Sequence, residues 1–229
     1  MSKKSLYVII GILAAVLIIS LYFNKELYFA ANRLADAENT VKGLIKSGQV
    51  REGDIIFQTS RSHQGIAIEK ATHSDFSHCG LVLKNTVGYY VLEAVQPVKR
   101  TPLAEWIAKG RQNHFAIKRL KSADAVLTNS VMNKMKASGD SMVGRNYDAY
   151  FGWGDDSLYC SELVWKIYQR STGLQLGRLQ ALKDFDLSSE TVQKKLKARY
   201  NGHIPLDEKV ISPEAIYNSD LLISEASNY

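Results

Sequence analysis

The chain has 229 residues, of which 45% are apolar and 23% are charged, and its formal net charge is +6. This composition is ordinary for a globular protein and is sufficient for one domain with a sizeable core. The basic residues are scattered except in the run 194–199, which we interpret as one solvated helix face, so the charge pattern argues against a nucleic-acid partner.

An apolar run behind two lysines occupies the N-terminus. Leu6 to Phe23 has 18 residues without a charge and follows Lys3 and Lys4, so residues 1–23 are either a signal anchor or a signal peptide. The run is long for a signal peptide and no small-residue cleavage site follows it directly, so we favour an uncleaved anchor in the inner membrane. The leading charges then place the body outside the cytoplasm, facing the periplasm of a Gram-negative source. A cleaved leader would release the body there.

The remaining chain divides into a helix and one domain. Residues 24–47 contain no proline and a single glycine, which predicts a juxtamembrane linker helix. Residues 48–229 show no internal repeat, low-complexity tract or change in composition, so we expect one domain.

Within that domain, strand and helix patterns are mixed, which predicts an α+β fold. Strands are expected at 55–58, 78–84, 89–95 and 115–120, with a turn at 85–86 between the second and third. Helices are expected at 64–71, 102–109, 123–138 and from 160 to near 173, with further helical material over 174–210 and a proline-started helix at about 213–217.

Cys160 stands at the start of one of these helical patterns. The segment 152–157 before it is rich in glycine and in N-cap residues, which predicts that Cys160 lies in the first turn of a helix. The apolar positions that follow fall on one helical face: Leu163, Val164, Ile167 and Tyr168. Unpaired backbone N–H groups and the positive end of the helix dipole stabilise a thiolate at such a position, so Cys160 is a candidate nucleophile.

A nucleophilic cysteine needs a base, and one of the five histidines has a suitable neighbour. With a two-residue turn at 85–86, His78 lies directly opposite Glu93 in a hairpin. With a four-residue turn, Glu93 lies opposite Gly80 and still shares a face with His78. The predicted hairpin therefore places a carboxylate beside an imidazole, as a base and the group that orients it.

The second cysteine, Cys79, offers a competing explanation of Cys160. Two cysteines in an oxidising compartment can form a disulfide. Cys79 neighbours His78 on a strand, so its side chain should point to the opposite face. If His78 faces Cys160, Cys79 faces away, and we expect a small buried residue instead of a disulfide.

Other interpretations of these residues stay open at this point. A cysteine on an apolar helix is often a buried hydrophobe, and a histidine near a carboxylate is often a surface hydrogen bond. The histidines and cysteines lack the close spacing of a zinc site, so we expect no metal and no cofactor. His63, His114 and His203 have no context that indicates a role.

The chain resembles the YiiX/YaeF-like family of permuted papain-like proteins, which are related to the NlpC-type cell-wall amidases. The resemblance extends over roughly residues 50 to 218, nearly the whole predicted domain. It is carried by the segments 53–58 (GDIIFQ), 71–78 (ATHSDFSH), 93–95 (EAV) and 159–165 (YCSELVW), with further likeness at 97–99, 101–103, 106–108, 185–188 and 210–213.

This resemblance implies a circularly permuted papain-like fold, in which an antiparallel β-barrel or sheet that carries the histidine precedes the helix that carries the cysteine. The residues that match the family's motifs are Cys160 as nucleophile, His78 as base and Glu93 as the orienting residue. The hairpin geometry indicates His78 and Glu93 independently, and the start of the helical pattern indicates Cys160.

We therefore expect a cysteine hydrolase or acyltransferase that cleaves an amide or ester bond through a Cys160 thioester. The Cys160 backbone N–H would bind the oxyanion together with a second donor, for which Gln58, Tyr147 and Tyr159 are the candidates. The expected substrate is a cell-envelope peptide or lipid. The alternatives are a non-catalytic envelope binding module that retains the pocket, and a membrane-anchored structural protein with a Cys79–Cys160 disulfide.

Overall fold

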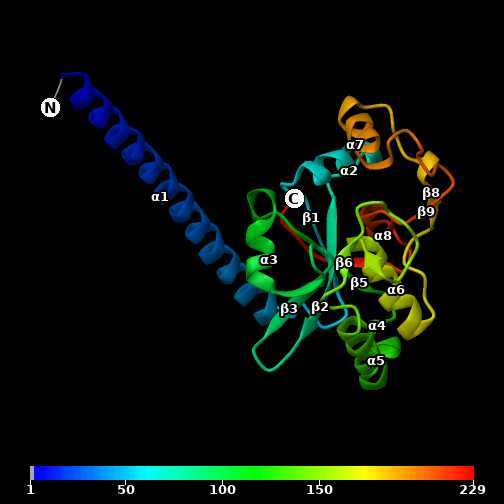
Figure 1. The fold of residues 1–229 in the computed structure, drawn as a ribbon. Coiled ribbons are helices and arrows are strands. Elements are labelled where there is room, and N and C mark those ends of the chain that lie inside the picture. Colours follow the sequence, from blue (N-terminus) through cyan, green and yellow to red (C-terminus); the bar gives the residue numbers. More distant parts are fainter. Residues whose placement is uncertain (1–2) are drawn as a thin grey trace.

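The structure is a computed structural model that describes residues 3–229; the first two residues of the predicted 1–23 segment lie outside it. Figure 1 shows a long N-terminal helix and a body of mixed helices and strands. The helices are α1 (Lys3–Lys46), α2 (His63–Thr72), α3 (Leu103–Lys109), α4 (Ala123–Val126), α5 (Asn129–Asp140), α6 (Cys160–Thr172), α7 (Glu190–Tyr200), α8 (Pro213–Tyr217) and the 3-10 turns η1 (Arg111–Asn113) and η2 (Leu182–Asp184). The strands are β1 (Ile55–Gln58), β2 (His78–Lys84), β3 (Tyr89–Glu93), β4 (Lys99–Pro102), β5 (Ala116–Leu120), β6 (Asn146–Tyr147), β7 (Ser157–Leu158), β8 (Gln180–Ala181), β9 (Lys209–Val210) and β10 (Leu222–Ser227).

Six of these strands form the central sheet, in the order β10-β5-β1-β2-β3-β4. Every neighbouring pair is antiparallel. The sheet has β10 and β4 as its two edges and does not close into a barrel. Of the two predicted alternatives, a barrel or an open sheet, the structure has the open sheet. The expected α+β fold is confirmed.

Strict alternation along the strands gives the sheet two buried faces. In β1, Ile55 and Phe57 belong to one hydrophobic cluster, which also contains the apolar side chains of α6. Ile56 belongs to the other cluster, with residues of α3 and of the C-terminal part of α1. The sheet is therefore a central layer between helices, because side chains alternate between the two faces of a strand.

Helix α1 runs without a break through the predicted boundary at residues 23 and 24. Its later part is docked onto the body: Ala37 is fully buried and Leu44 is 6% exposed. Its apolar N-terminal part, including Leu17, Leu21 and Phe23, is exposed. Among the described residues, α1 is the one helix long and apolar enough to cross a membrane.

The hairpin between β2 and β3 has a four-residue turn, so the predicted two-residue turn at 85–86 is wrong. Lys84 pairs with Tyr89, and the Asn85 side chain accepts hydrogen bonds from the backbone N–H groups of Val87 and Gly88. This asparagine turn closes the loop at Gly88, whose φ of +149° suits glycine. The change in length is even, so His78 and Glu93 keep their shared face.

Other element predictions differ from the structure in identifiable ways. The helix predicted over 123–138 is two helices, because Thr128 caps a new one by accepting from the Val131 N–H. Strands β4 and β10 were not predicted, and residues 174–189 contain no α-helix. The short β4 (KRTP) is largely exposed, so it has no apolar pattern to reveal it.

Candidate active site

Cys160 begins α6, as the glycine-rich segment and the helical pattern predicted. Tyr159 is the extended N-cap residue, and its backbone N–H donates to the Glu162 carboxylate over 3.3 Å. At the other end, Gly173 ends the helix in the left-handed conformation. Cys160 itself is 2% exposed. The unpaired N–H groups of the first turn therefore surround a nearly buried sulfur.

His78 and Glu93 are in direct contact at one end of the sheet. His78 Nε2 lies 2.7 Å from Glu93 Oε2. His78 opens β2 and Glu93 ends β3, so the hairpin brings the two side chains together on the face that also carries α3. The structure thus brings the predicted pair of side chains together, and their roles as base and orienting carboxylate stay a prediction.

Two further side chains hold Glu93, and neither was predicted. Thr101 Oγ1 donates to Glu93 Oε1 over 2.6 Å, and Trp106 Nε1 donates to Glu93 Oε2 over 2.9 Å. The Trp106 ring also stacks on His78, with ring centroids 5.7 Å apart and an angle of 22° between the planes. A buried tryptophan usually has a partner for its N–H, which is the signal that could have indicated Trp106.

The imidazole is also hydrogen-bonded to the cysteine. Burial alone would lower the His78 pKa, but the hydrogen bonds to Cys160 and Glu93 and their negative charges outweigh it and raise the pKa to about 10. Burial raises the Glu93 pKa, whereas the contact with His78 and the Thr101 hydrogen bond lower it to about 2. Because Nε2 bonds Glu93, the other ring nitrogen, Nδ1, is left for the thiol.

The Cys160 thiol is strongly acidic in this setting. Its pKa is lowered well below the ordinary value, first by a hydrogen bond from the Cys79 side chain and then, against the effect of burial, by His78. The Cys79 backbone N–H adds a further hydrogen bond to the sulfur. These directions favour a thiolate beside an imidazolium as the resting state of the pair.

The prediction that Cys79 faces away from Cys160 is wrong. The strand does alternate, and Cys79 lies in the cluster with Phe57 and Cys160, on the face opposite His78. The prediction assumed that only one face of the sheet could contact Cys160. Helix α6 packs on the Cys79 face, and His78 contacts Cys160 as well because it is the first residue of β2, at the end of the sheet. Both cysteines are free thiols, and burial raises the pKa of Cys79 well above its ordinary value.

The three predicted oxyanion donors lie in different places. Gln58 pairs with His78 across β1 and β2, and its Oε1 packs against Gly110 on the α3 side. The Tyr159 hydroxyl accepts the Ile211 backbone N–H over 3.1 Å. The Tyr147 hydroxyl accepts from Gln64 Nε2 over 2.6 Å. Burial and then the Cys160 charge raise the pKa of Tyr147 well above its ordinary value.

An apolar pocket of about 90 Å³ begins at Cys160 and runs between α2 and α7. Its walls include Ala67 and Ile68 from α2, Val192 and Leu196 from α7, and Phe151. Arg199 spans the two helices: it donates to Gln64 Oε1 over 3.1 Å and lies over the Phe151 ring. Neither Gln64 nor Arg199 was predicted, because their meeting depends on the packing of α2 against α7.

Comparison with known proteins decides the family. Residues 49–223 match the model of the permuted papain-like amidase family YaeF/YiiX, C92. The chain belongs to this family. It is 45% identical to YiiX of Escherichia coli K12 over 181 residues, which are 79% of this chain and 88% of that protein. Membership makes the chain a cysteine hydrolase of the amidase or peptidase type.

A solved structure agrees with this fold. The crystal structure of metalloprotein YiiX from Escherichia coli O157:H7 has a TM-score of 0.75 and 45% sequence identity, and it covers 79% of this chain and 99% of that chain. In the described part of the present chain, no three His, Cys, Asp or Glu side chains gather in an arrangement that could hold a metal ion.

Proposed function

We propose that the protein cleaves an amide or ester bond of a cell-envelope lipid or peptide through a thioester on Cys160. The observation that carries this proposal is the contact of His78 with both Cys160 and Glu93. That contact supplies an ionised nucleophile, a proton carrier and a group that fixes the imidazole.

In the first half-reaction, the Cys160 thiolate attacks the substrate carbonyl carbon and the carbonyl electrons move to oxygen. The tetrahedral intermediate then collapses, and the leaving amine or alcohol takes its proton from the His78 imidazolium. Glu93 holds the ring and stabilises its charge throughout. The product of this step is the Cys160 thioester.

In the second half-reaction, the neutral His78 removes a proton from water as the water attacks the thioester. The intermediate expels the Cys160 thiolate and releases a carboxylic acid, and the ion pair is restored. An amine or alcohol acceptor in place of water gives an acyl transfer with the same proton movements.

Of the three candidate donors for the oxyanion, the geometry favours Tyr147. Its hydroxyl accepts a hydrogen bond from Gln64, so its own hydrogen is available to donate. The Tyr159 hydroxyl likewise accepts from Ile211, but the Cys160 charge is a smaller cause of its pKa shift than Glu162 and Ile211 are, whereas for Tyr147 it follows burial directly. The Gln58 Oε1 packs toward Gly110. The Cys160 backbone N–H, at the start of α6, supplies the second hydrogen bond.

The walls of the pocket favour a lipid over a peptidoglycan peptide as the substrate. An acyl chain that enters between α2 and α7 is surrounded by Ala67, Ile68, Val192 and Leu196, and its carbonyl end reaches Cys160. A polar stem peptide would lose its hydration there without new partners, at a cost of about 1–3 kcal/mol for each unpaired group. The exposed apolar part of α1 supports a location at a membrane, where such lipids reside.

Trapping the thioester tests this proposal. The full chain in detergent is mixed in turn with N-acyl phospholipid, diacyl phospholipid and muropeptides, quenched in acid and digested. Mass spectrometry of the peptide that contains Cys160 should show an added acyl group with a lipid and none with muropeptides. The adduct should be absent in Cys160→Ala and should form far more slowly in His78→Ala.

The outcomes separate the hypotheses. An adduct from muropeptides alone would reject the lipid and keep the hydrolase. No adduct with any substrate, together with unchanged biological activity in Cys160→Ser, would favour the non-catalytic binding module.

A further inference from the structure

Helix α1 lies along the sheet in a fixed direction. Its C-terminal end is at the end of the sheet away from the active site, where Arg119 donates to the Gly48 carbonyl. Its residue Arg33 is at the other end, where the Arg33 carbonyl accepts a hydrogen bond from Asn113 Nδ2 over 2.9 Å. Asn113 belongs to η1, which leads into Ala116, the residue paired with Phe57.

The active site lies at this same end of the sheet. Gln58 pairs with His78 where β1 ends and β2 begins, and Ala116 begins β5 one step away. Followed toward its N-terminus, α1 therefore passes the active-site end and continues beyond it, as Figure 1 shows.

The apolar part of α1 begins shortly after that point. From Arg33 to Phe23 the helix rises by about 15 Å, at about 1.5 Å per residue. The loop before α2 carries Arg61, whose Nε donates to the Gly110 carbonyl. Partial burial and then the Arg33 charge lower the pKa of Arg61, and Glu26 acts in the opposite direction, so Arg61 is within electrostatic reach of the turns of α1 that follow the apolar run.

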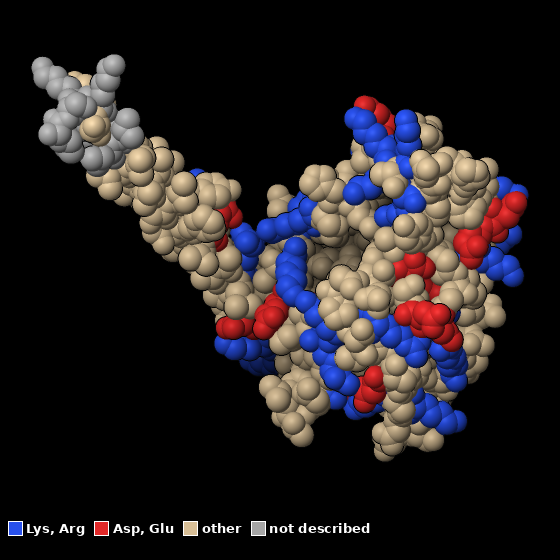
Figure 2. Space-filling view, viewed as in Figure 1, with Lys and Arg blue, Asp and Glu red and all other residues tan. Residues whose placement is uncertain are grey.

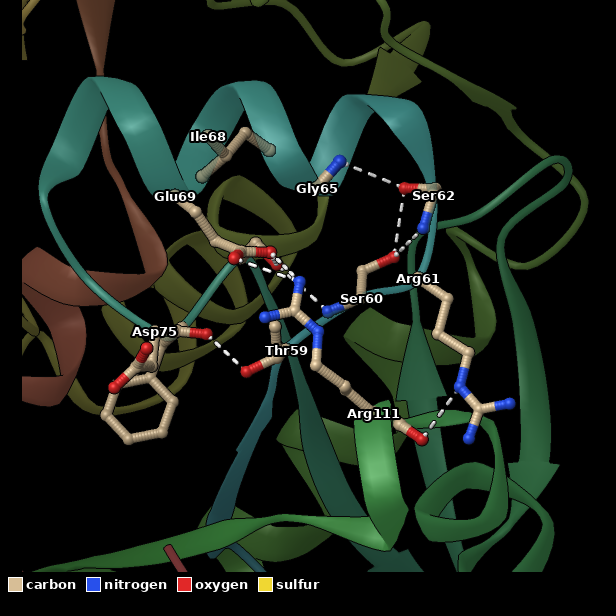
Figure 3. A network of polar contacts seen from close by, with 12 residues as sticks. Thr59, Ser60, Arg61, Ser62, Gly65, Ile68, Glu69, Asp75 and Arg111 are labelled. Atoms are coloured by element: carbon tan, nitrogen blue, oxygen red, sulfur yellow. Dashed lines mark hydrogen bonds and ion pairs between the residues drawn. The ribbon is translucent and has the colours of Figure 1, made fainter.

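A polar network fixes the loop and α2 at this end (Figure 3). The Arg111 guanidinium contacts both oxygens of the Glu69 carboxylate at 3.0 Å. Ser62 caps α2 by accepting from the Gly65 N–H, and Arg61 Nε donates to the Gly110 carbonyl. The helix that forms one wall of the Cys160 pocket is thereby held to the sheet on the side of α1.

Basic side chains gather at the active-site end. Figure 2 shows them over α7, at the top of the view, and along the hollow between α1 and the body. They come from the loop before α2, from α2, from η1 and from α7: Arg61, Lys70, Arg111, Lys194, Lys195, Lys197 and Arg199. Of these, only Arg111 and Lys194 form a salt bridge with a carboxylate of the described residues. Of the others, Lys70 and Lys197 are exposed, and Arg61 is exposed while its Nε donates to Gly110, so these three can face an anionic partner.

We propose that the α2–α7 end of the body docks on the anionic phospholipid headgroups of the bilayer that α1 crosses, so that the Cys160 pocket receives its substrate from that bilayer. The inference deepens the proposed lipid hydrolase and rests on it. Docked in this way, Arg61 and the α7 lysines meet the headgroup phosphates, and an acyl chain enters between α2 and α7 without crossing water.

Amide hydrogen exchange in nanodiscs tests the docking. The full chain, carrying Cys160→Ala so that no lipid is consumed, is inserted in discs of phosphatidylcholine or of a phosphatidylcholine and phosphatidylglycerol mixture. Each basic residue at the headgroups should strengthen docking about fivefold. Exchange in 60–64 and 190–200 should therefore slow by at least about fivefold in the anionic discs, and high salt should abolish the difference.

A matched pair of variants controls for net charge. Lys70→Glu with Lys197→Glu, on exposed residues of α2 and α7, should abolish the slowing. Lys121→Glu with Lys134→Glu, on exposed residues at the far end of the sheet and on α5, should leave it intact. Equal exchange in both lipids for the parent chain, or equal effects of both variant pairs, overturns the docking. The readout needs no turnover, so its failure leaves the thioester chemistry standing, and failure of thioester trapping leaves the docking standing.

Discussion

At the scale of single residues, both oxygens of the Glu93 carboxylate have partners. Thr101 occupies Oε1, and His78 and Trp106 share Oε2. A buried carboxylate with three donors stays ionised, which keeps His78 charged and its ring in place. The acidity of Cys160 therefore depends on residues that never touch the sulfur.

Trp106→Phe tests this dependence. The variant keeps an aromatic ring against His78 but removes the N–H that Glu93 accepts, and a hydrogen bond to a charged group contributes about 1.5–3 kcal/mol. We expect a lower free energy of unfolding in urea and a higher apparent pKa of Cys160. Trp165→Phe is the matched control, because Trp165 Nε1 is buried without a partner in the described structure. Equal losses in the two variants would show that the Glu93 hydrogen bond contributes nothing specific.

Cys79→Ala tests the hydrogen bond from the Cys79 thiol to Cys160, which the alternation of side chains along the strand did not predict. The substitution removes the thiol that donates to Cys160 and leaves the backbone N–H in place. The thiolate then loses one of its hydrogen bonds, so the Cys160 pKa should rise while His78 still holds it below that of a free thiol. The pH profile of Cys160 alkylation measures the change, and an unmoved profile would assign Cys79 to packing alone.

At the scale of elements, the β2–β3 pairing positions the base and its orienting group. Gly80 lies within this pairing, where a Cβ would stand 2.3 Å from Val91 Cγ1 and 3.0 Å from the Leu92 carbonyl oxygen. Only glycine allows the strands to approach this closely, two residues after His78.

Gly80→Ala should therefore lower the free energy of unfolding by about 1–3 kcal/mol and slow Cys160 alkylation, since His78 and Glu93 shift apart. Gly43→Ala is the control: it lies in α1 with open space around its Cα and should raise stability by about 0.5–1 kcal/mol. Thermal or urea unfolding measures both. A Gly80→Ala protein as stable as its parent would contradict the close approach.

The same elements show how far sequence patterns reach. The place of Cys160 at a helix start and the shared face of His78 and Glu93 both follow from local periodicity. The predicted turn was two residues too short, and a shift by an even number of residues leaves His78 and Glu93 on the same face. Thr101 and Trp106 enter the site only through the pairing of β3 with β4, and Gln64 meets Arg199 only through the packing of α2 on α7. Such contacts between distant segments leave no periodic pattern in the sequence. Cys79 was misplaced because strand alternation fixes the face to which Cys79 points but does not show that α6 packs on that same face.

At the scale of the whole molecule, α1 is both a candidate anchor and a packed part of the body. Its docked half fixes the direction in which the apolar half leaves, so the active-site end has one orientation to any membrane that α1 crosses. A flexible linker would not constrain this orientation.

Inserting two helical turns into the exposed part of α1, between Leu27 and Tyr28, should lift the body by about 11 Å. Headgroup contact of α7 should then weaken, and exchange at 190–200 in anionic nanodiscs should approach that in neutral discs. Stability of the body should stay unchanged, since residues 33–46 keep their packing. Undiminished protection of α7 in the lengthened protein would argue against an orientation set by α1.

The central claim is that Cys160 is ionised by His78, and its alkylation rate tests this most directly. Iodoacetamide is added to the native full chain from about pH 5 to about pH 9, and the adduct at Cys160 is quantified by mass spectrometry. A lowered thiol pKa and a His78 pKa of about 10 keep the ion pair intact across this range. The rate should therefore be nearly independent of pH. In His78→Ala the Cys79 hydrogen bonds remain but the imidazolium is lost, so the rate should fall at low pH and rise with pH across the range. A wild-type rate that itself rises across this range, or a His78→Ala profile identical to wild type, would contradict the account.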